Sequence, residues 1–181
     1  IPGFILNSSE RYKYLAYRLK KMLISAISII SMQIKQGNFE PVDYEVSFRK
    51  NGKYPPIKIV LNDGQEITLV GQIDRIDELE KDDTKYIRII DYKSGDKSIN
   101  LTEVYYGLQL QLLVYLDAII DSDRHKKSNL KPAAILYNRI DNPIVRSNED
   151  QKDSVINEEI LKKLRMNGLV LKDVDIIGEM D

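Results

Sequence analysis

Two apolar segments, residues 67–79 and 85–93, are separated by only a short charged loop. Both are rich in isoleucine, which is typical of strands that run into a protein core. Because the loop is short enough for a β-hairpin, the two segments are predicted to pair in an antiparallel arrangement. A hairpin of this kind needs further layers to cover its faces, which favours a sheet packed against helices.

Two other segments show the spacing of amphipathic helices. Residues 8–37 carry apolar residues three and four positions apart, with Ser8 or Ser9 able to cap the helix and Gly37 able to end it. Residues 101–120 repeat the pattern, and we expect one continuous second helix there. Its apolar stripe consists of Leu101, Val104, Tyr105, Leu108, Leu112, Tyr115 and Ile119.

The remaining segments indicate strands and one short helix. Residues 39–75 alternate and contain turn sequences at Asn51-Gly52 and Asn62-Asp63-Gly64, which predicts a meander of short strands. Residues 132–137 are predicted to form a buried strand, and residues 158–166 a short helix. The order of elements predicts an α/β (α+β) fold in which helices flank a mixed, largely antiparallel central sheet.

Composition narrows the classes of function. The 181 residues, 43% hydrophobic and 30% charged, fit a single globular domain. No apolar run approaches the roughly 18 residues of a membrane span, and no secretory signal is visible, so we expect a cytoplasmic protein without membrane contact. Since the net charge is -1, any contact with DNA has to come from local patches or metal ions. The absence of cysteine excludes disulfides and thiolate metal sites.

Charged side chains gather where the two strands of the predicted hairpin end. If the loop is centred between Asp82 and Asp83, Asp74 and Asp91 face each other with Cβ atoms about 4.5–5.5 Å apart. Lys93 follows Asp91 by two positions and therefore shares its face of the strand. A divalent cation would remove the repulsion between the carboxylates, and their oxygens suit Mg²⁺ or Mn²⁺. A solvated strand face could carry the same residues by chance, but charges at the ends of core strands are costly unless paired or metal-bound.

Gln111 and Tyr115 form a third element. They lie four residues apart on the predicted second helix and therefore share a face. Tyr115 also fits the apolar stripe, so a core tyrosine is the alternative interpretation. Gln111 lies beside the stripe and could reach a phosphate or a base edge.

In combination, these motifs resemble the RecB-like nucleases of the PD-(D/E)XK superfamily. The resemblance rests on Gly71-x-x-Asp74, Asp91-Tyr92-Lys93 and Gln111-Leu-Leu-Val-Tyr115, in that order. Longer stretches around these motifs, together with residues 166–181, are similar to the C-terminal nuclease domain of AddB (RexB) subunits of bacterial ATP-dependent helicase–nucleases.

The resemblance implies a restriction-endonuclease-like core and a metal-dependent deoxyribonuclease that acts in double-strand break repair and recombination. Asp74, Asp91 and the backbone carbonyl of Tyr92 would hold Mg²⁺ or Mn²⁺. Lys93 would orient or activate the attacking water and steady the phosphate charge, while Gln111 and Tyr115 would complete the catalytic set and touch DNA. The implied partners are DNA and an AddA-type helicase–nuclease subunit, in the bacterial cytoplasm.

Two features of the family are missing. Family members carry an upstream metal-binding His, whereas the only His here is His125, which we expect to be a solvated loop residue. Glu45 is the first candidate for a further ligand, with an exposed strand glutamate as the alternative. AddB-type domains also enclose an iron–sulfur cluster held by cysteines, which is expected in the parent protein but has no ligands here. Because the chain begins at Ile1, we expect a fragment of a much larger protein, and the fragment alone could be inactive.

Two alternatives to an AddB-type nuclease remain open. The chain could belong to a different RecB-like exonuclease, or it could be a non-catalytic DNA-binding or scaffold module of the same fold. The similarity of residues 166–181 favours AddB, and the complete set of five candidate catalytic residues favours activity.

Overall fold

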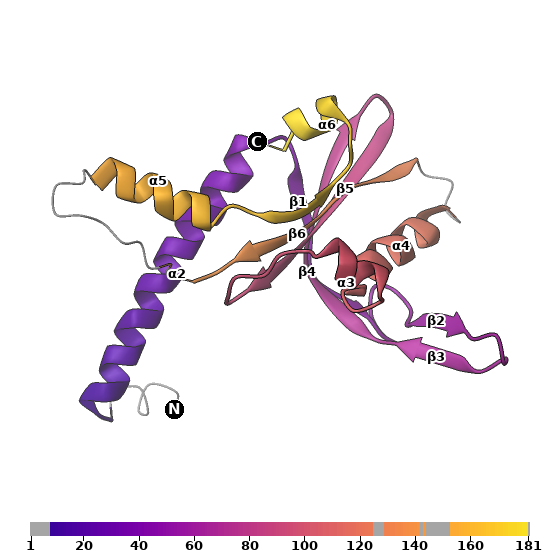
Figure 1. Ribbon diagram of the computed structural model, residues 1–181, viewed down its shortest axis with the longest axis horizontal. Helices are drawn as coiled ribbons and strands as arrows, with labels where there is room; N and C mark the ends of the chain where they lie inside the picture. The colour runs from indigo at the N-terminus through magenta and orange to yellow at the C-terminus, as the bar shows by residue number, and fades with distance from the viewer. Residues whose placement is uncertain (1–7, 125–128, 142, 144–152, 181) are drawn as a thin grey trace.

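A five-stranded mixed sheet in the order β1-β4-β5-β6-β7 forms the centre of the molecule, and helices flank it (Figure 1). The computed structural model describes residues 8–124, 129–141, 143 and 153–180. Only β5 and β6 run parallel, and the other neighbouring pairs are antiparallel. The strands are β1 (Glu40–Phe48), β4 (Gly71–Lys81), β5 (Thr84–Lys93), β6 (Leu130–Arg139) and β7 (Asn167–Val170). The predicted fold class is therefore confirmed.

Each face of the sheet has its own core. Ile89 and Ile90, adjacent on β5, belong to different hydrophobic clusters, as expected of neighbours that point to opposite faces. Helix α4 (Gln111–Arg124) covers the first face, and the short helix α6 (Val174–Gly178) covers the second with the buried Ile176. The α4 residues in the first core are Leu112, Tyr115 and Ile119. Burial of each such side chain contributes about 1.5–3 kcal/mol, so both layers hold the sheet.

The predicted second helix is wrong as a single element, because the chain forms two helices there. Helix α3 (Leu101–Tyr105) ends before Gly107, whose φ of 80° breaks the helical path, and α4 begins only at Gln111. Glycine tolerates this left-handed angle, so Gly107 was the signal for the break. The predicted apolar stripe consequently holds only in α4. Three of its residues on the α3 side are exposed: Leu101, Tyr105 and Leu108.

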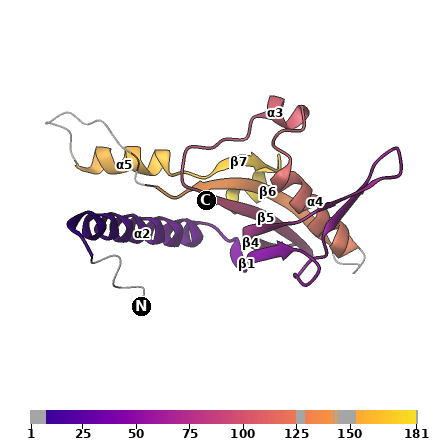
Figure 2. The ribbon, with the colours of Figure 1, turned by 90° about the horizontal axis from the view of Figure 1, so that it is seen from below.

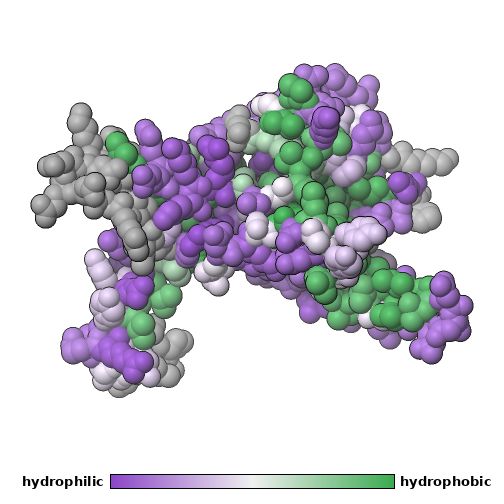
Figure 3. All heavy atoms as spheres, in the orientation of Figure 1, coloured by the Kyte–Doolittle hydropathy of each residue, from purple (hydrophilic) through white to green (hydrophobic). Residues whose placement is uncertain are grey.

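The predicted meander is wrong in its connectivity. Strands β2 (Ile57–Val60) and β3 (Glu66–Leu69) pair only with each other, as a separate hairpin that projects from the molecule (Figure 1). Strand β1 pairs instead with β4. Pro55 and Pro56 interrupt the chain between β1 and β2, since proline cannot donate to a strand ladder. The hairpin leaves apolar side chains such as Val60 on the surface, where Figure 3 shows a hydrophobic patch.

The C-terminal part contains one helix that was predicted and a strand that was not. Helix α5 (Asp153–Lys163) corresponds to the helix predicted over residues 158–166, and edge strand β7 follows it. Gly168 lets β7 approach β6 closely, because a Cβ at this position would lie 2.0 Å from the carbonyl oxygen of Ile135. Strand β7 was missed because it has only four residues and glycine gives no strand signal.

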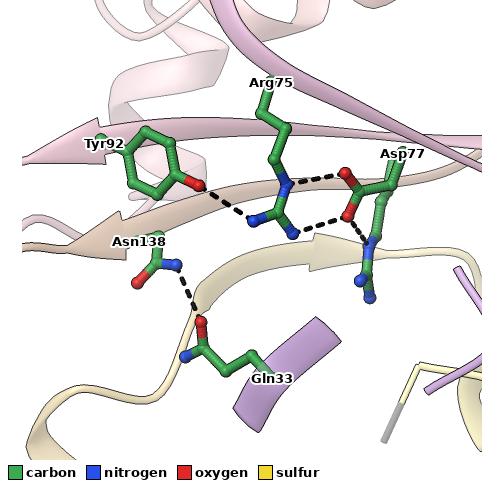
Figure 4. Close-up of polar contacts among 6 residues, drawn as sticks. Gln33, Arg75, Asp77, Tyr92 and Asn138 are labelled. Carbon is green, nitrogen blue, oxygen red and sulfur yellow. Dashed lines mark hydrogen bonds and ion pairs between the residues drawn. The ribbon is translucent and has the colours of Figure 1, made fainter. Parts of the chain in front are cut away.

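The long helix predicted near the N-terminus is α2 (Glu10–Gln36). Ser9 caps it by accepting a hydrogen bond from the N–H of Tyr12 at 3.4 Å. Its C-terminal half is tied to the sheet by Gln33, which accepts a hydrogen bond from Asn138 at 2.9 Å (Figure 4). Its N-terminal half extends past the sheet (Figure 2), and no residue of α2 is buried. Neither α2 nor any other helix among the described residues is long and apolar enough to cross a membrane.

Candidate active site

The β4–β5 hairpin brings two of the predicted site residues to one end of the sheet. Residues 82–83 form its turn with φ angles of 50° and 56°, as in the type I′ turns that match the twist of paired strands. This turn produces the register predicted from the sequence, and the last pair of the ladder is Arg75 with Ile90. Asp74 and Asp91 are the residues that follow directly at the open end.

Asp91 ends a buried stretch of β5 and is itself only 4% exposed. Its Oδ2 forms an ion pair with Nζ of Lys93, so both side chains lie on the same face of the strand, as predicted. Among the described residues, this Oδ2 has no hydrogen-bond partner of ordinary geometry. A buried carboxylate normally accepts several hydrogen bonds. Asp91 therefore retains free acceptor capacity, as a metal ligand must.

The side chain of Asp74 points toward β5 in a direction that the sequence pattern did not predict. Ile73 and Ile76, three residues apart, both belong to the core under α4, so the regular alternation of β4 fails between them. The carboxylate of Asp74 lies against the backbone of β5, where Oδ2 accepts a hydrogen bond from the N–H of Tyr92 at 2.7 Å. Asp74 is therefore attached to the residue next to Asp91, although simple alternation does not describe its direction.

Tyr115 is both a core residue and a support for Gln111. Its ring is 6% exposed and stacks on Phe48 with centroids 5.0 Å apart. A Cβ at Gly71 would lie 1.6 Å from the Tyr115 hydroxyl, so only glycine can begin β4 here, three residues before Asp74. The same hydroxyl accepts a hydrogen bond of 3.4 Å from Nε2 of Gln111. The arrangement holds the exposed Gln111 at the first turn of α4.

A metal ion would find few protein ligands at this end of the sheet. Within the part of the chain that the structure describes, no group of three or more His, Cys, Asp or Glu residues is placed to hold a metal. Glu45 is exposed, although its φ of 50° is unusual for a strand residue. His125 lies outside the described residues. The acidic groups that fit a divalent cation are Asp74 and Asp91, and Mg²⁺ commonly binds one or two carboxylates and completes its shell with water and substrate.

Tyr137 of β6 forms the wall beside Asp91. The two residues are partners in the parallel ladder, and Nζ of Lys93 lies 5.8 Å from the Tyr137 ring centroid. Burial raises the pKa of Tyr137, and the negative charge of Asp91 raises it further, while Lys93 lowers it. The phenol therefore stays protonated at neutral pH and adds no negative charge next to Asp91.

The opposite face of the same hairpin carries a buried ion cluster that the sequence analysis missed. Asp77 is fully buried and accepts two hydrogen bonds from Arg75, both of 2.7 Å, and one from Arg88 of 2.9 Å. Arg75 also donates to the hydroxyl of Tyr92 at 2.9 Å (Figure 4). Burial lowers the pKa of Arg75, but hydrogen bonding and the charge of Asp77 outweigh it and raise the pKa. The predicted register places Asp77 opposite Arg88, and that pairing was the available signal.

Comparison with known proteins identifies the family of the chain. Residues 4–170 match the family model described as PD-(D/E)XK nuclease superfamily. The chain is 70% identical over its full length to a protein of Clostridioides difficile (strain 630) that is named as a subunit of an ATP-dependent helicase/deoxyribonuclease. It is 58% identical over its full length to the protein of the same name from Caldanaerobacter subterraneus subsp. tengcongensis, and 52% identical over 99% of its length to that from Clostridium acetobutylicum. In each case the match covers 16% of the relative.

Proposed function

The chain belongs to the PD-(D/E)XK nuclease superfamily, and from this premise we propose that it is the DNA-cleaving domain of an AddB-like helicase–nuclease subunit. The proposed activity is metal-dependent exonucleolytic hydrolysis of phosphodiester bonds during double-strand break repair and recombination. The names of the relatives, which specify a deoxyribonuclease, support the substrate class. Because the chain spans 16% of those relatives, the activity is proposed for the full-length protein.

The observation that carries the proposal is the incomplete hydrogen bonding of the buried Asp91 carboxylate. Among the residues that the structure describes, Lys93 is the ion-pair partner of its buried Oδ2, and the carboxylate of Asp74 accepts a hydrogen bond from the next residue of β5. Asp74, Asp91 and the carbonyl of Tyr92 are the groups that would hold Mg²⁺ or Mn²⁺, since hard oxygen ligands suit both ions. When bound, the cation polarises the scissile phosphate and lowers the pKa of an attacking water.

The residues of the chain itself supply orientation and charge. Lys93 neutralises Asp91 in the structure, and its flexible ammonium can turn to a non-bridging phosphate oxygen and steady the charge that develops there. Gln111, held by Tyr115 at the first turn of α4, presents amide hydrogens to the DNA backbone. The N–H of Tyr92 fixes the rotation of the Asp74 carboxylate and leaves its other oxygen for the cation.

We further propose that an AddA-type subunit is the partner, because the relatives are named as one subunit of a helicase/deoxyribonuclease. A chromosomal DNA substrate would place the complex in the bacterial cytoplasm. An iron–sulfur cluster, which the AddB resemblance implies, has no possible cysteine ligand in this chain.

A second candidate function is a non-catalytic DNA-binding module. It is favoured by one observation, that the described residues contain no cluster of three or more metal-ligating side chains. Asp91 argues against it, because a buried structural carboxylate is expected to have its acceptors satisfied, as Asp77 has, whereas Oδ2 of Asp91 lacks a hydrogen-bond partner among the described residues.

The experiment compares Asp74→Asn with Asp63→Asn in the full-length protein, with any nuclease site of the partner disabled. Both carboxylates accept a hydrogen bond from a backbone N–H, but Asp63 lies on the exposed β2–β3 turn and accepts from Gln65 at 3.1 Å. Asparagine preserves that bond and removes the charge. Cleavage of linear duplex DNA in Mg²⁺ or Mn²⁺ is measured. We expect Asp74→Asn to lower the rate on the order of 10²-fold and Asp63→Asn to leave it unchanged.

Two results would contradict the proposal. Full-rate cleavage by the Asp74→Asn protein would remove Asp74 from the site. No cleavage by the wild-type protein, with either metal, would favour the non-catalytic module.

A further inference from the structure

A second polar site adjoins the candidate active site. The end of β5, the loop that follows it, the end of β6 and the end of α5 surround a hollow of about 190 Å³, which we call the basic hollow. Figure 3 shows hydrophilic side chains gathered where α5 meets the sheet. Six cations line the basic hollow: Lys93, Lys97, Arg139, Lys162, Lys163 and Arg165.

The charge of the basic hollow contrasts with that of the whole chain. Asp96 is the acidic residue of its lining. Even when Asp91 and Asp141, the partners of Lys93 and Arg139, are counted as well, the cations exceed the acids by three. The complete chain has a net charge of -1, so positive charge is concentrated at this site. Such a local excess attracts an anionic ligand although the protein as a whole does not.

Three of the cations are available to a ligand, and a fourth is fixed. Lys97, Lys162 and Arg165 are exposed and form no ion pair with any residue that the structure describes. Arg139 is held by two hydrogen bonds to Asp141, at 2.8 and 2.6 Å. The hollow therefore combines one rigid guanidinium with three side chains that can close on a small anion.

The basic hollow is continuous with the candidate active site through Lys93. The ring of Tyr137 lies beneath both lysines, with its centroid 5.8 Å from Nζ of Lys93 and 5.2 Å from Nζ of Lys97. Phosphates of one DNA strand follow each other at about 3.4 Å along the helix axis. Because Lys93 itself lines the hollow, a phosphate next to one bound at Lys93 on the same strand comes within reach of the other cations.

We propose that the basic hollow binds a phosphodiester of the cleaved strand beside the scissile one, through Lys97, Lys162 and Arg165. The inference rests on the proposed nuclease function. The hollow has roughly the volume of six liquid waters, which accommodates one phosphate group. Its contacts are with charge and not with base edges, so they position the strand without selecting a sequence.

The test compares two double charge reversals in the full-length protein. Lys162→Glu with Arg165→Glu alters the hollow, while Lys20→Glu with Lys21→Glu on the exposed surface of α2 changes the net charge equally. The affinity for a short labelled single strand is measured in EDTA, at several salt concentrations. The DNA concentration for half-maximal cleavage is then measured in Mg²⁺, with the partner's nuclease site disabled.

We expect the hollow variant to bind about tenfold more weakly, with the salt dependence reduced by about 0.7 per lost phosphate contact. It should need correspondingly more DNA for half-maximal cleavage and keep the wild-type rate at saturation. One neutral methylphosphonate beside the scissile bond should weaken binding by the wild type but not by the hollow variant.

Equal affinity and equal salt dependence in the two double variants would overturn the inference. Absence of cleavage by the wild type would reject the nuclease function instead. The EDTA measurement does not depend on cleavage, so a difference between the variants there would still support a phosphate site.

Discussion

Two buried carboxylates of one hairpin, Asp77 and Asp91, differ in the number and kind of their hydrogen-bond and ion-pair partners. Asp77, on β4, accepts three hydrogen bonds of 2.7–2.9 Å from two arginines. Asp91, on β5, has Lys93 as its ion-pair partner and an Oδ2 without an ordinary hydrogen bond in the described structure. They also belong to opposite faces of the sheet.

The contrast is the one expected between a structural carboxylate and the metal ligand that we propose. Rigid guanidinium groups saturate Asp77, and Arg88 is held in turn by the ring of Phe39, 4.8 Å away. The lysine beside Asp91 is flexible and 31% exposed, so it can leave without unfolding the strand. Burial alone therefore does not distinguish the two carboxylates, whereas the number and the rigidity of their hydrogen-bond donors do.

The largest expected effect is on stability and comes from Asp77→Ala. Asp77→Ala removes the negative charge that Asp77 supplies to two buried arginines, and breaking a buried ion pair costs about 3–5 kcal/mol. Hydrogen exchange of the β4 and β5 amides in the full-length protein measures the loss locally. Asp63→Ala, at an exposed turn, is the control. A change below about 1 kcal/mol for Asp77→Ala would show that Asp77 is not a structural carboxylate.

The next effect is on rate and comes from Lys93→Ala. Preorganised charge at a developing oxyanion is worth about 10²–10³ in rate, so cleavage should fall by that factor. DNA affinity should hardly change, since one phosphate contact among many is a small part of the total. Cleavage and unwinding are measured on the same linear duplex, with Lys85→Ala as control, because Lys85 pairs with Glu78 near the other end of β5. Undiminished cleavage would remove Lys93 from the mechanism.

The hairpin was largely predictable because its turn determines its register. The two-residue turn was located from the charged loop, and all seven pairs of the β4–β5 ladder follow from it. The same register places Asp77 opposite Arg88, so the ion cluster was encoded in the predicted pairing. It was overlooked because Arg75 and Asp77 read as solvated charges unless both faces of the sheet are known to be covered.

Other parts depended on tertiary packing. The direction of the Asp74 side chain could not be predicted, since regular alternation would place Ile73 and Ile76 on opposite faces, whereas both lie in the core under α4. The support that Tyr115 gives to Gln111 requires its close approach to Gly71, which no local pattern contains. The cations of the basic hollow come from separate segments of the chain, so only the folded sheet brings them together.

The smallest expected effect comes from Tyr92→Phe, which removes the hydroxyl that accepts from Arg75. A hydrogen bond to a charged group contributes about 1.5–3 kcal/mol to the free energy of unfolding. We expect a loss at the lower end of this range, because Arg75 still forms its ion pair with Asp77 in the variant. Local stability is measured as for Asp77→Ala, with the exposed Tyr44→Phe as control.

The same variant should also change how the stability of the hairpin depends on pH in the alkaline range. Burial raises the pKa of Tyr92 above 10.0, although Arg75 opposes this. A raised pKa in the folded state stabilises the fold below the unfolded pKa, and this contribution is lost as the pH rises through the folded value. Wild-type stability should therefore fall more steeply above pH 10.0 than that of Tyr92→Phe. Parallel curves would show that the phenol does not contribute.

The most direct test of the contrast between the two carboxylates is Mn²⁺ binding by the full-length protein, followed by electron paramagnetic resonance, in Asp91→Asn and the wild type. Asparagine has the shape of aspartate but lacks its charge. If Asp91 is kept available for a metal, Asp91→Asn loses the bound Mn²⁺ and the cleavage activity, while hydrogen exchange of β4 and β5 stays at the wild-type level. Wild-type Mn²⁺ binding by the variant, or a loss of protection like that expected for Asp77→Ala, would show that Asp91 is a structural carboxylate as well.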